Sequence, residues 1–238
     1  MIKSLSPISG LSAIRRKYER GLIMKNVQAY MVVGLMISVF VSHTYASPLI
    51  DAIGRGDLAG VVAKAQAINE KDDIGSTALH EAAYRGFADI AKFLLDKGAD
   101  VNAKNNPGLT PLHYAAMNYF SRYSNLDIAV MLIEKGADVN AKDKSGNTPI
   151  HIPALNCNVE MVRLLIEKGA DVNAKNDEGR TALHETSGNG SFECVNLLYE
   201  NGADVNAKTK DGKTASDLAR NNGHVELADA LDKVVKKP

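Results

Sequence analysis

Cysteine is scarce in this sequence, and neither charge nor flexible residues are in excess. Two cysteines among 238 residues are too few for a disulfide-framework protein or for a zinc site of four thiolates. The 19 glycines and 7 prolines are ordinary for this length, which excludes collagen-like and low-complexity chains. With 45% apolar residues and a length typical of one or two domains, the composition indicates a folded protein.

The net charge of zero hides an uneven distribution. Residues 1–46 carry six basic side chains and one acidic one, Glu19, so that 22 basic and 27 acidic side chains remain in the other 192 residues. This larger part therefore has a net charge of −5. A surface of this sign repels phosphate backbones, and we expect no binding of nucleic acid.

The first 46 residues have the layout of a secretory signal. A charge-free apolar stretch covers residues 30–41, Lys25 precedes it, and the small residues Thr44 and Ala46 follow it. These features are typical of a cleavable signal, and a start at Met24 would give it a conventional length. We therefore predict a signal, or an extension plus a signal, and an exported protein that is periplasmic or secreted. The alternative is an uncleaved inner-membrane anchor at residues 30–41, although a spanning helix usually needs about 20 apolar residues.

The rest of the chain repeats itself. The heptapeptide Gly-Ala-Asp-Val-Asn-Ala-Lys occurs four times, starting at Gly98, Gly136, Gly169 and Gly202. Between its copies lies an element of the form Thr-x-Leu/Ile-His, which starts at Thr77, Thr110, Thr148 and Thr181. With Thr214 as a fifth member, these threonines are 33, 38, 33 and 33 residues apart. Such a period indicates a protein built by stacking similar units.

Each unit has the pattern of two helices and a hairpin. After the histidine comes a short segment that ends at a glycine such as Gly86, which can adopt the positive φ that ends a helix. A second segment has apolar residues at i, i+3 and i+4, as in Ile90, Phe93 and Leu94, which is one face of a helix. A polar hairpin with a glycine at its tip follows. One unit is too thin to bury its own apolar face, so the pattern predicts an all-α repeat solenoid.

A 33-residue period that carries Thr-Pro-Leu-His and Gly-Ala-Asp-Val-Asn resembles the ankyrin repeat. The resemblance covers about residues 48–233 and implies about four full repeats, each a helix-turn-helix plus a hairpin, between two capping repeats. The predicted boundaries are a degenerate capping repeat at 47–72, full repeats at 73–105, 106–143, 144–176 and 177–209, and a C-terminal capping repeat with a tail at 210–238.

The recurrent histidines suggest a metal site, but their positions oppose it. Stacked units place His80, His113, His151 and His184 in a row, whereas zinc needs three or four converging ligands. The resemblance implies a structural role, in which each imidazole ties a hairpin to the start of a helix. Because the sequence contains no recognisable nucleophile–base pair, phosphate loop or metal motif, we expect no catalytic residue, no metal and no cofactor.

The two cysteines occupy different positions in the repeat. Cys194 shares the register of Ile90, which predicts a small buried apolar side chain, whereas Cys157 takes the turn position of Gly86. Export would permit a disulfide, but the two lie in different layers at non-equivalent positions, so we expect no bond between them. Near Cys157, Pro153 interrupts a first helix and predicts a local distortion there.

The resemblance implies protein binding through the concave face and the hairpin tips. The 38-residue spacing adds five residues around 118–125, where aromatic and arginine side chains of the kind enriched at hot spots occur; alternatively, these rings pack on the scaffold. The predicted contact residues are Ile74, Tyr84, Arg85, Leu109, Met117, Asn118, Tyr119, Phe120, Arg122, Tyr123, Asn147, Leu155, Asn156 and Arg180. We expect an apolar centre around Leu109, Met117 and Leu155.

These observations predict a non-catalytic, monomeric protein–protein interaction scaffold whose partner is another protein. Contact with a membrane is expected only through the N-terminal segment if it stays uncleaved. One alternative is a secreted effector that binds a eukaryotic host protein. Another, of a different class, is an enzyme with a site on the insertion at 118–125.

Overall fold

The structure, a computed structural model, describes residues 50, 52–53, 56–64, 68–117 and 125–235. All of them belong to one compact unit that covers residues 45–238. The predicted signal at 1–46 and the insertion residues 118–124 lie outside the described residues. Within the described ranges, none of the helices combines the length and the apolar character needed to span a membrane.

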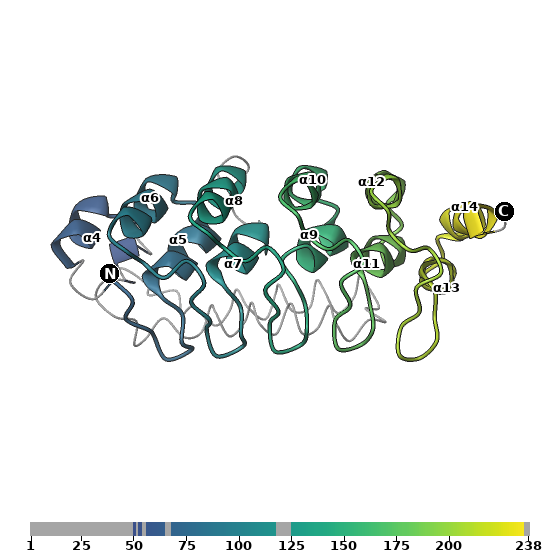
Figure 1. Ribbon diagram of the computed structural model, residues 1–238, viewed down its shortest axis with the longest axis horizontal. Helices are drawn as coiled ribbons and strands as arrows, with labels where there is room; N and C mark the ends of the chain where they lie inside the picture. The colour runs from purple at the N-terminus through teal and green to yellow at the C-terminus, as the bar shows by residue number, and fades with distance from the viewer. Residues whose placement is uncertain (1–49, 51, 54–55, 65–67, 118–124, 236–238) are drawn as a thin grey trace, which may run out of the picture. The chain divides into compact units, whose positions relative to one another are not determined.

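The described ranges form pairs of helices joined by turns. The first helix of each repeat is α5 (Ala78–Arg85), α7 (Pro111–Met117), α9 (His151–Asn156), α11 (Ala182–Gly188) or α13 (Ala215–Asn221). The second helices are α4 (Leu58–Lys64), α6 (Ala88–Asp96), α8 (Asn125–Glu134), α10 (Val159–Glu167), α12 (Phe192–Glu200) and α14 (Val225–Val235). Successive pairs stack in chain order, and the loops between them all project to the same side (Figure 1). The all-α repeat solenoid predicted from the sequence is confirmed.

Most first helices begin directly after the threonine of the Thr-x-Leu/Ile-His element. Thr77 has an extended backbone and forms a capping box with His80, in which each side chain accepts a hydrogen bond from the other residue's backbone N–H. This arrangement satisfies donors that the first turn of a helix leaves unpaired. The helix then ends at Gly86, whose φ of 76° is the left-handed conformation that glycine adopts without steric cost.

The fourth repeat departs from this scheme. Helix α9 begins three residues after Thr148 rather than directly after it, and it has six residues against eight in α5. Pro153 lies in its first turn and has no N–H to donate, which explains the late start. The helix ends at Cys157, whose φ of 49° is the only positive value for a non-glycine residue in the described ranges. The distortion predicted from Pro153 is confirmed.

The core lies between the two rows of helices. It contains the Leu or Ile of the Thr-x-Leu/Ile-His element and the i, i+3, i+4 stripe of the second helices. The first group is Leu79, Leu112, Ile150 and Leu183, and the stripe starts at Ile90, Ile128, Met161, Cys194 and Leu227, all of them buried. Each buried aliphatic side chain contributes about 1.5–3 kcal/mol, and most of this burial needs a neighbouring repeat.

Candidate functional site

Each of the four recurrent histidines joins its own repeat to the next. His80 Nδ1 accepts from the Thr77 backbone N–H at 3.0 Å, and Nε2 lies 3.0 Å from the carbonyl oxygen of Leu109, one repeat on. Because Nδ1 accepts, the proton lies on Nε2, which donates to that carbonyl. The same bonds recur at His113, His151 and His184, with the carbonyls of Asn147, Arg180 and Lys213. The predicted structural role is confirmed.

Burial keeps these imidazoles neutral. The pKa of His80 and that of His113 fall to about 4, because desolvation disfavours the charged ring. Burial also lowers the pKa of His151 and of His184. Neutral rings are the form that the observed bonds require, since a protonated Nδ1 could not accept from the threonine N–H.

The heptapeptide forms a second line of bonds between repeats. The Asn102 side chain donates to the Gly136 carbonyl at 2.9 Å and accepts from the Asp138 N–H at 2.9 Å, both in the next copy. Lys104 Nζ donates to the Lys142 carbonyl at 2.8 Å. Equivalent bonds start at Asn69, Lys71, Asn140, Lys142, Asn173 and Lys175. The four copies are alike because each must fit the next.

The hairpin tips also contact one another closely. The Lys144 N–H donates to the Pro107 carbonyl at 2.9 Å, and the Asp177 N–H donates to the Ser145 carbonyl at 2.9 Å. A Cβ atom at Gly146, which has a φ of 76°, would lie 2.8 Å from the Asp177 nitrogen. Glycine is therefore required at this tip by its φ and by the approach of the next hairpin.

The recurrent polar residues are thus occupied in holding the repeats together. In the part of the chain that the structure describes, no three His, Cys, Asp or Glu side chains are grouped so that they could hold a metal ion.

Three of the predicted contact residues are buried, which corrects the predicted surface. Leu109 is only 1% exposed and fills the space between repeats, while its carbonyl accepts from His80. Tyr84 is buried with its ring 5.8 Å from that of Tyr114, edge to face. Leu109 is therefore part of the core, whereas Met117 and Leu155, the other members of the expected apolar centre, are half-buried.

Arg180, the third buried residue, forms a bidentate ion pair. Its Nε lies 2.8 Å from Glu185 Oε1 and its Nη2 lies 2.9 Å from Oε2. Both side chains are less than a tenth exposed. A fork of two parallel bonds is the geometry in which a guanidinium best compensates the desolvation of a carboxylate. Arg180 is therefore paired inside the fifth repeat and does not present its charge to a partner.

Asn147 also has internal partners. Its amide nitrogen donates to Asp143 Oδ2 at 3.2 Å, its Oδ1 accepts from the Asn176 amide at 2.9 Å, and its carbonyl accepts from His113. The side chain is half-buried. Its role in the structure is to join the hairpins of the fourth and fifth repeats.

The remaining predicted contacts divide into accessible residues and residues outside the described ranges. Ile74, Met117 and Leu155 are half-buried and Asn156 is exposed, while Arg85 is half-buried and paired with Glu81. Met117, Leu155 and Asn156 belong to the last turns of first helices. Asn118, Tyr119, Phe120, Arg122 and Tyr123 lie outside the described residues.

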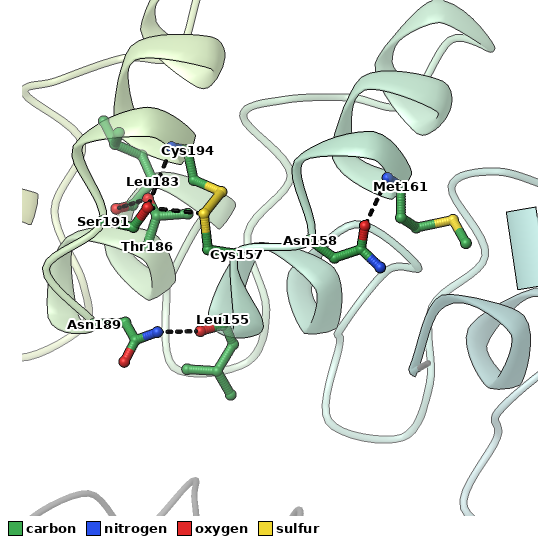
Figure 2. Close-up of a disulfide and its surroundings, with 9 residues drawn as sticks. All are labelled: Leu155, Cys157, Asn158, Met161, Leu183, Thr186, Asn189, Ser191 and Cys194. Carbon is green, nitrogen blue, oxygen red and sulfur yellow. Dashed lines mark hydrogen bonds between the residues drawn. A yellow bond between two sulfur atoms is a disulfide. The ribbon is translucent and has the colours of Figure 1, made fainter. Parts of the chain in front are cut away.

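The two cysteines form a disulfide, contrary to the sequence-based expectation. Cys157 and Cys194 have Cα atoms 5.7 Å apart and are bonded through their sulfur atoms. Figure 2 shows Cys157 at the turn after α9 and Cys194 on the neighbouring helix of the next repeat. The predicted burial of Cys194 is confirmed, since none of it is exposed.

The offset between stacked repeats explains why non-equivalent positions meet. A Cβ at Gly190 would lie 2.4 Å from His224 Nδ1, and one at Gly56 would lie 3.5 Å from the Phe87 ring. The turn of one repeat therefore faces the residue that precedes the second helix of the next repeat. For Cys157 this residue is Ser191, whose Oγ lies 2.8 Å from Cys157 Sγ. Cys194 follows Ser191 by about one helical turn and so faces the same point.

The second helices carry exposed apolar side chains that the sequence analysis did not single out. Phe192 and Tyr199 of α12 are 45% and 46% exposed, and Val225 of α14 is 52% exposed. The seven-residue spacing of Phe192 and Tyr199 places both on one face of α12. This spacing could have indicated from the sequence that the two side chains share a face. Isolated exposed apolar residues are normal, so this face serves below as a control surface.

This protein consists of stacked helix pairs joined by equivalent hydrogen bonds between repeats. It is therefore a helical repeat scaffold. The family whose model matches this chain is described as ankyrin repeats (three copies). It matches at residues 40–143, 103–176, 121–209 and 172–234. Because the matches together cover most of the chain, this protein belongs to the ankyrin-repeat family. Its repeats therefore form a protein–protein interaction scaffold, a type of domain that is typically non-catalytic.

Curated relatives share single stretches of repeats with this chain. BCL-6 corepressor-like protein 1 of Homo sapiens is 47% identical over 51 residues, which are 21% of this chain and 3% of that protein. Neurogenic locus notch homolog protein 1 of Xenopus laevis is 46% identical over 70 residues, 29% of this chain and 2% of that protein. Protein phosphatase 1 regulatory subunit 12A of Mus musculus is 52% identical over 42 residues, 18% and 4% respectively. The chain thus spans a few per cent of each relative's length.

Proposed function

We propose that this ankyrin-repeat protein is exported from the cytosol. Outside the cytosol it binds a partner protein through its hairpin tips and the ends of its first helices. The partner is a folded or extended polypeptide that docks on a surface held rigid by the bonds between repeats. A preformed surface loses little conformational entropy on binding.

The observation that carries the proposed export is the disulfide. Cys157 and Cys194 are bonded across two repeats, and disulfides of this kind persist in oxidising compartments and are rare in the cytosol. The apolar stretch at 30–41, with Lys25 before it and Ala46 after it, supports the same proposal because it has the layout of a secretory signal.

The proposed contact surface, called here the tip surface, consists of Pro107, Met117, Lys144, Leu155 and Asn156. Lys144 and Asn156 are exposed, and the other three are half-buried. They belong to the third and fourth repeats, at hairpin tips and at the last turns of α7 and α9. Half-buried apolar side chains beside exposed polar ones are typical of a protein interface.

The export proposal is tested by fusing residues 1–46 to an alkaline phosphatase that is active only after export and disulfide formation. We expect active enzyme and a processed product whose first residue is Ser47. A matched fusion with Leu35→Arg and Val39→Asp in the apolar stretch should be inactive. Equal activity of the two fusions, or no activity from either, would overturn the proposal.

The tip surface is tested by affinity capture with immobilised protein from residue 47 onward. Met117→Arg combined with Leu155→Arg should abolish capture of any specific partner. The matched control places the same substitutions on the control surface, as Phe192→Arg with Tyr199→Arg, and should capture as the unaltered protein does. Circular dichroism checks that both variants are folded. If only the Phe192→Arg, Tyr199→Arg variant lost capture, the tip surface would be wrong and the partner would bind the second helices instead.

A further inference from the structure

We propose that the Cys157–Cys194 disulfide is a thiol–disulfide exchange site, entered at Cys157 by a dithiol reductant, and that its reduction loosens the fourth repeat from the fifth. The inference goes beyond the proposed function. Its test uses purified protein, so its outcome does not depend on where the protein is located.

The two cysteine residues differ in their exposure to solvent. Cys194 is the third residue of α12 and has no exposed surface, whereas Cys157 is half-buried in the turn after α9. An attacking thiolate must approach one sulfur along the axis of the bond to the other. Because only Cys157 has exposed surface, an external thiolate attacks at Cys157 and Cys194 is the leaving group. Figure 2 shows the bond between the two sulfur atoms.

The exchange balances in two steps. A thiolate of the reductant attacks Cys157 Sγ, the bond to Cys194 Sγ breaks, and Cys194 leaves as a thiolate that takes a proton from solvent. The second thiol of the reductant, as its thiolate, then attacks its partner sulfur in the mixed disulfide and releases Cys157. The protein gains two electrons and two protons, and the dithiol becomes a disulfide.

Neighbouring groups can stabilise each sulfur as a thiolate and so offset the burial of Cys194. The Ser191 hydroxyl, 2.8 Å from Cys157 Sγ, can donate to this sulfur when it is released as a thiolate. Cys194 lies in the first turn of α12, where the positive end of the helix dipole favours a leaving thiolate. Its N–H already donates to Ser191 Oγ at 3.4 Å, so the turn keeps its shape while the sulfur leaves.

The turn at Cys157 has an unfavourable backbone conformation, and the disulfide adds a covalent constraint to it. Its φ of 49° is left-handed, a conformation that the turns at Gly86, Gly190 and Gly223 assign to glycine. A side chain disfavours this conformation. The preceding helix, α9, has six residues and is the shortest of the first helices in the described ranges. Once the covalent bond is broken, this junction keeps a strained turn on a short helix.

Other bonds keep the reduced protein folded. His151 Nε2 still reaches the Arg180 carbonyl at 3.2 Å, and Asn173 and Lys175 donate to the carbonyls of Gly202 and Lys208. The Asn189 amide also donates to the Leu155 carbonyl at 2.9 Å. Reduction therefore produces a local opening at the end of α9 and not dissociation of the last repeats.

The first test traps the exchange intermediate. The oxidised protein, as isolated from its host, is incubated in native buffer with a thioredoxin whose resolving cysteine is changed to serine. We expect a mixed disulfide that peptide mass spectrometry assigns to Cys157. An adduct on Cys194, or an adduct that forms only in denaturant, would overturn the proposal.

The second test measures the consequence by amide hydrogen exchange. On reduction, exchange of the amides in residues 151–158 should become at least tenfold faster, with little change in residues 78–96. Cys157→Gly removes the disulfide but restores the glycine of the other turns, so its exchange should be slower than that of the reduced protein. If reduced protein, oxidised protein and Cys157→Gly exchange alike in residues 151–158, the proposed loosening is wrong.

Discussion

The second and fourth repeats share one framework but secure it by different means. In the second repeat, an eight-residue helix ends at Gly86, and the neighbouring repeat is held by hydrogen bonds from His80 and the heptapeptide. In the fourth repeat, Pro153 shortens the helix, a cysteine replaces the turn glycine, and a disulfide adds a covalent bond to the next repeat. The comparison shows that a repeat can depart from the favoured residues where its junction gains another constraint.

The fifth repeat also differs from the second in the residues that fill its first helix. Where the second repeat has Ala82 and Ala83, the fifth has Thr186 and Ser187, which are also buried. The Thr186 hydroxyl donates to the Leu183 carbonyl at 3.1 Å, and the buried pair of Arg180 and Glu185 lies beside it in the same repeat. Polar groups replace apolar ones in this helix, and an ion pair is buried in the same repeat.

Acid should have the largest effect on the free energy of unfolding, and it should act through the histidines of the second and third repeats. The pKa of His80 and of His113 is about 4 in the folded chain, against about 6.5 in an unfolded one. Between these values the unfolded chain binds protons that the folded chain does not. Stability therefore falls as the pH is lowered from 6.5 to 4, by about 3 kcal/mol for each ring at pH 4. Urea unfolding at pH 7.5 and 4.0 measures this loss.

The control for the acid effect is the double variant His80→Gln, His113→Gln. It should be less stable than the unaltered protein at pH 7.5, since each glutamine replaces only part of the imidazole's bonds. Its further loss on going to pH 4.0 should be smaller by several kcal/mol. An equally large loss in both proteins would assign the acid effect to other groups.

Reduction of the disulfide should cause the next largest loss of folding stability, and it should act on the fourth repeat. The disulfide joins residues 37 positions apart, and closing a loop of this size stabilises a folded chain by about 3–4 kcal/mol. Unfolding with and without a phosphine reductant measures the difference at pH 7.5. The variant Cys157→Ser, Cys194→Ala, which keeps an apolar side chain at the buried position, should be close in stability to the reduced protein and should not respond to the reductant. Equal stability of oxidised and reduced protein would contradict the comparison.

Removal of one member of the buried ion pair should lower the folding stability somewhat less than reduction of the disulfide does. Glu185→Ala leaves the Arg180 guanidinium buried without its carboxylate, and such losses amount to about 3 kcal/mol. Arg180→Leu combined with Glu185→Leu removes both charges and should recover most of that loss. Denaturant unfolding compares the two variants. A double variant less stable than Glu185→Ala would show that the pair itself is strongly stabilising.

The smallest effect sharpens the comparison of the two turns. In a reduced background, Cys157→Gly should be more stable than Cys157→Ser by about 1 kcal/mol, because glycine adopts the left-handed conformation without a steric penalty. The converse change, Gly86→Ser in the second repeat, should cost a similar amount. If serine and glycine at position 157 give the same stability, the left-handed turn has relaxed in the reduced protein.

Several features were predictable because they depend on local sequence. The capping box of Thr77 and His80 needs residues three apart, and the left-handed end at Gly86 needs a residue without a side chain. The structural role of the histidines was implied by the resemblance to the ankyrin repeat, and their placement in a row by the period between repeats opposed a metal site. Each of these inferences uses a spacing inside one repeat, or the period between repeats.

The burial of Leu109 and Arg180 and the bond between the cysteines were not predictable in the same way. Leu109 follows a hairpin tip in a position that varies between repeats, and only stacking shows that it points inward. Arg180 is buried because Glu185, five residues away, turns toward it. Neither a spacing nor a composition distinguishes these residues from exposed ones.

The sequence by itself determined the period, the helix starts and the polar positions that bind the next repeat, because these depend on spacings along the chain. Only the tertiary structure decided which variable residues are buried and that the turn at Cys157 meets the helix of Cys194. The physical reason is the offset between stacked repeats, which places a turn of one unit against the second helix of the next. That offset is a property of two packed surfaces and is not contained in any single repeat.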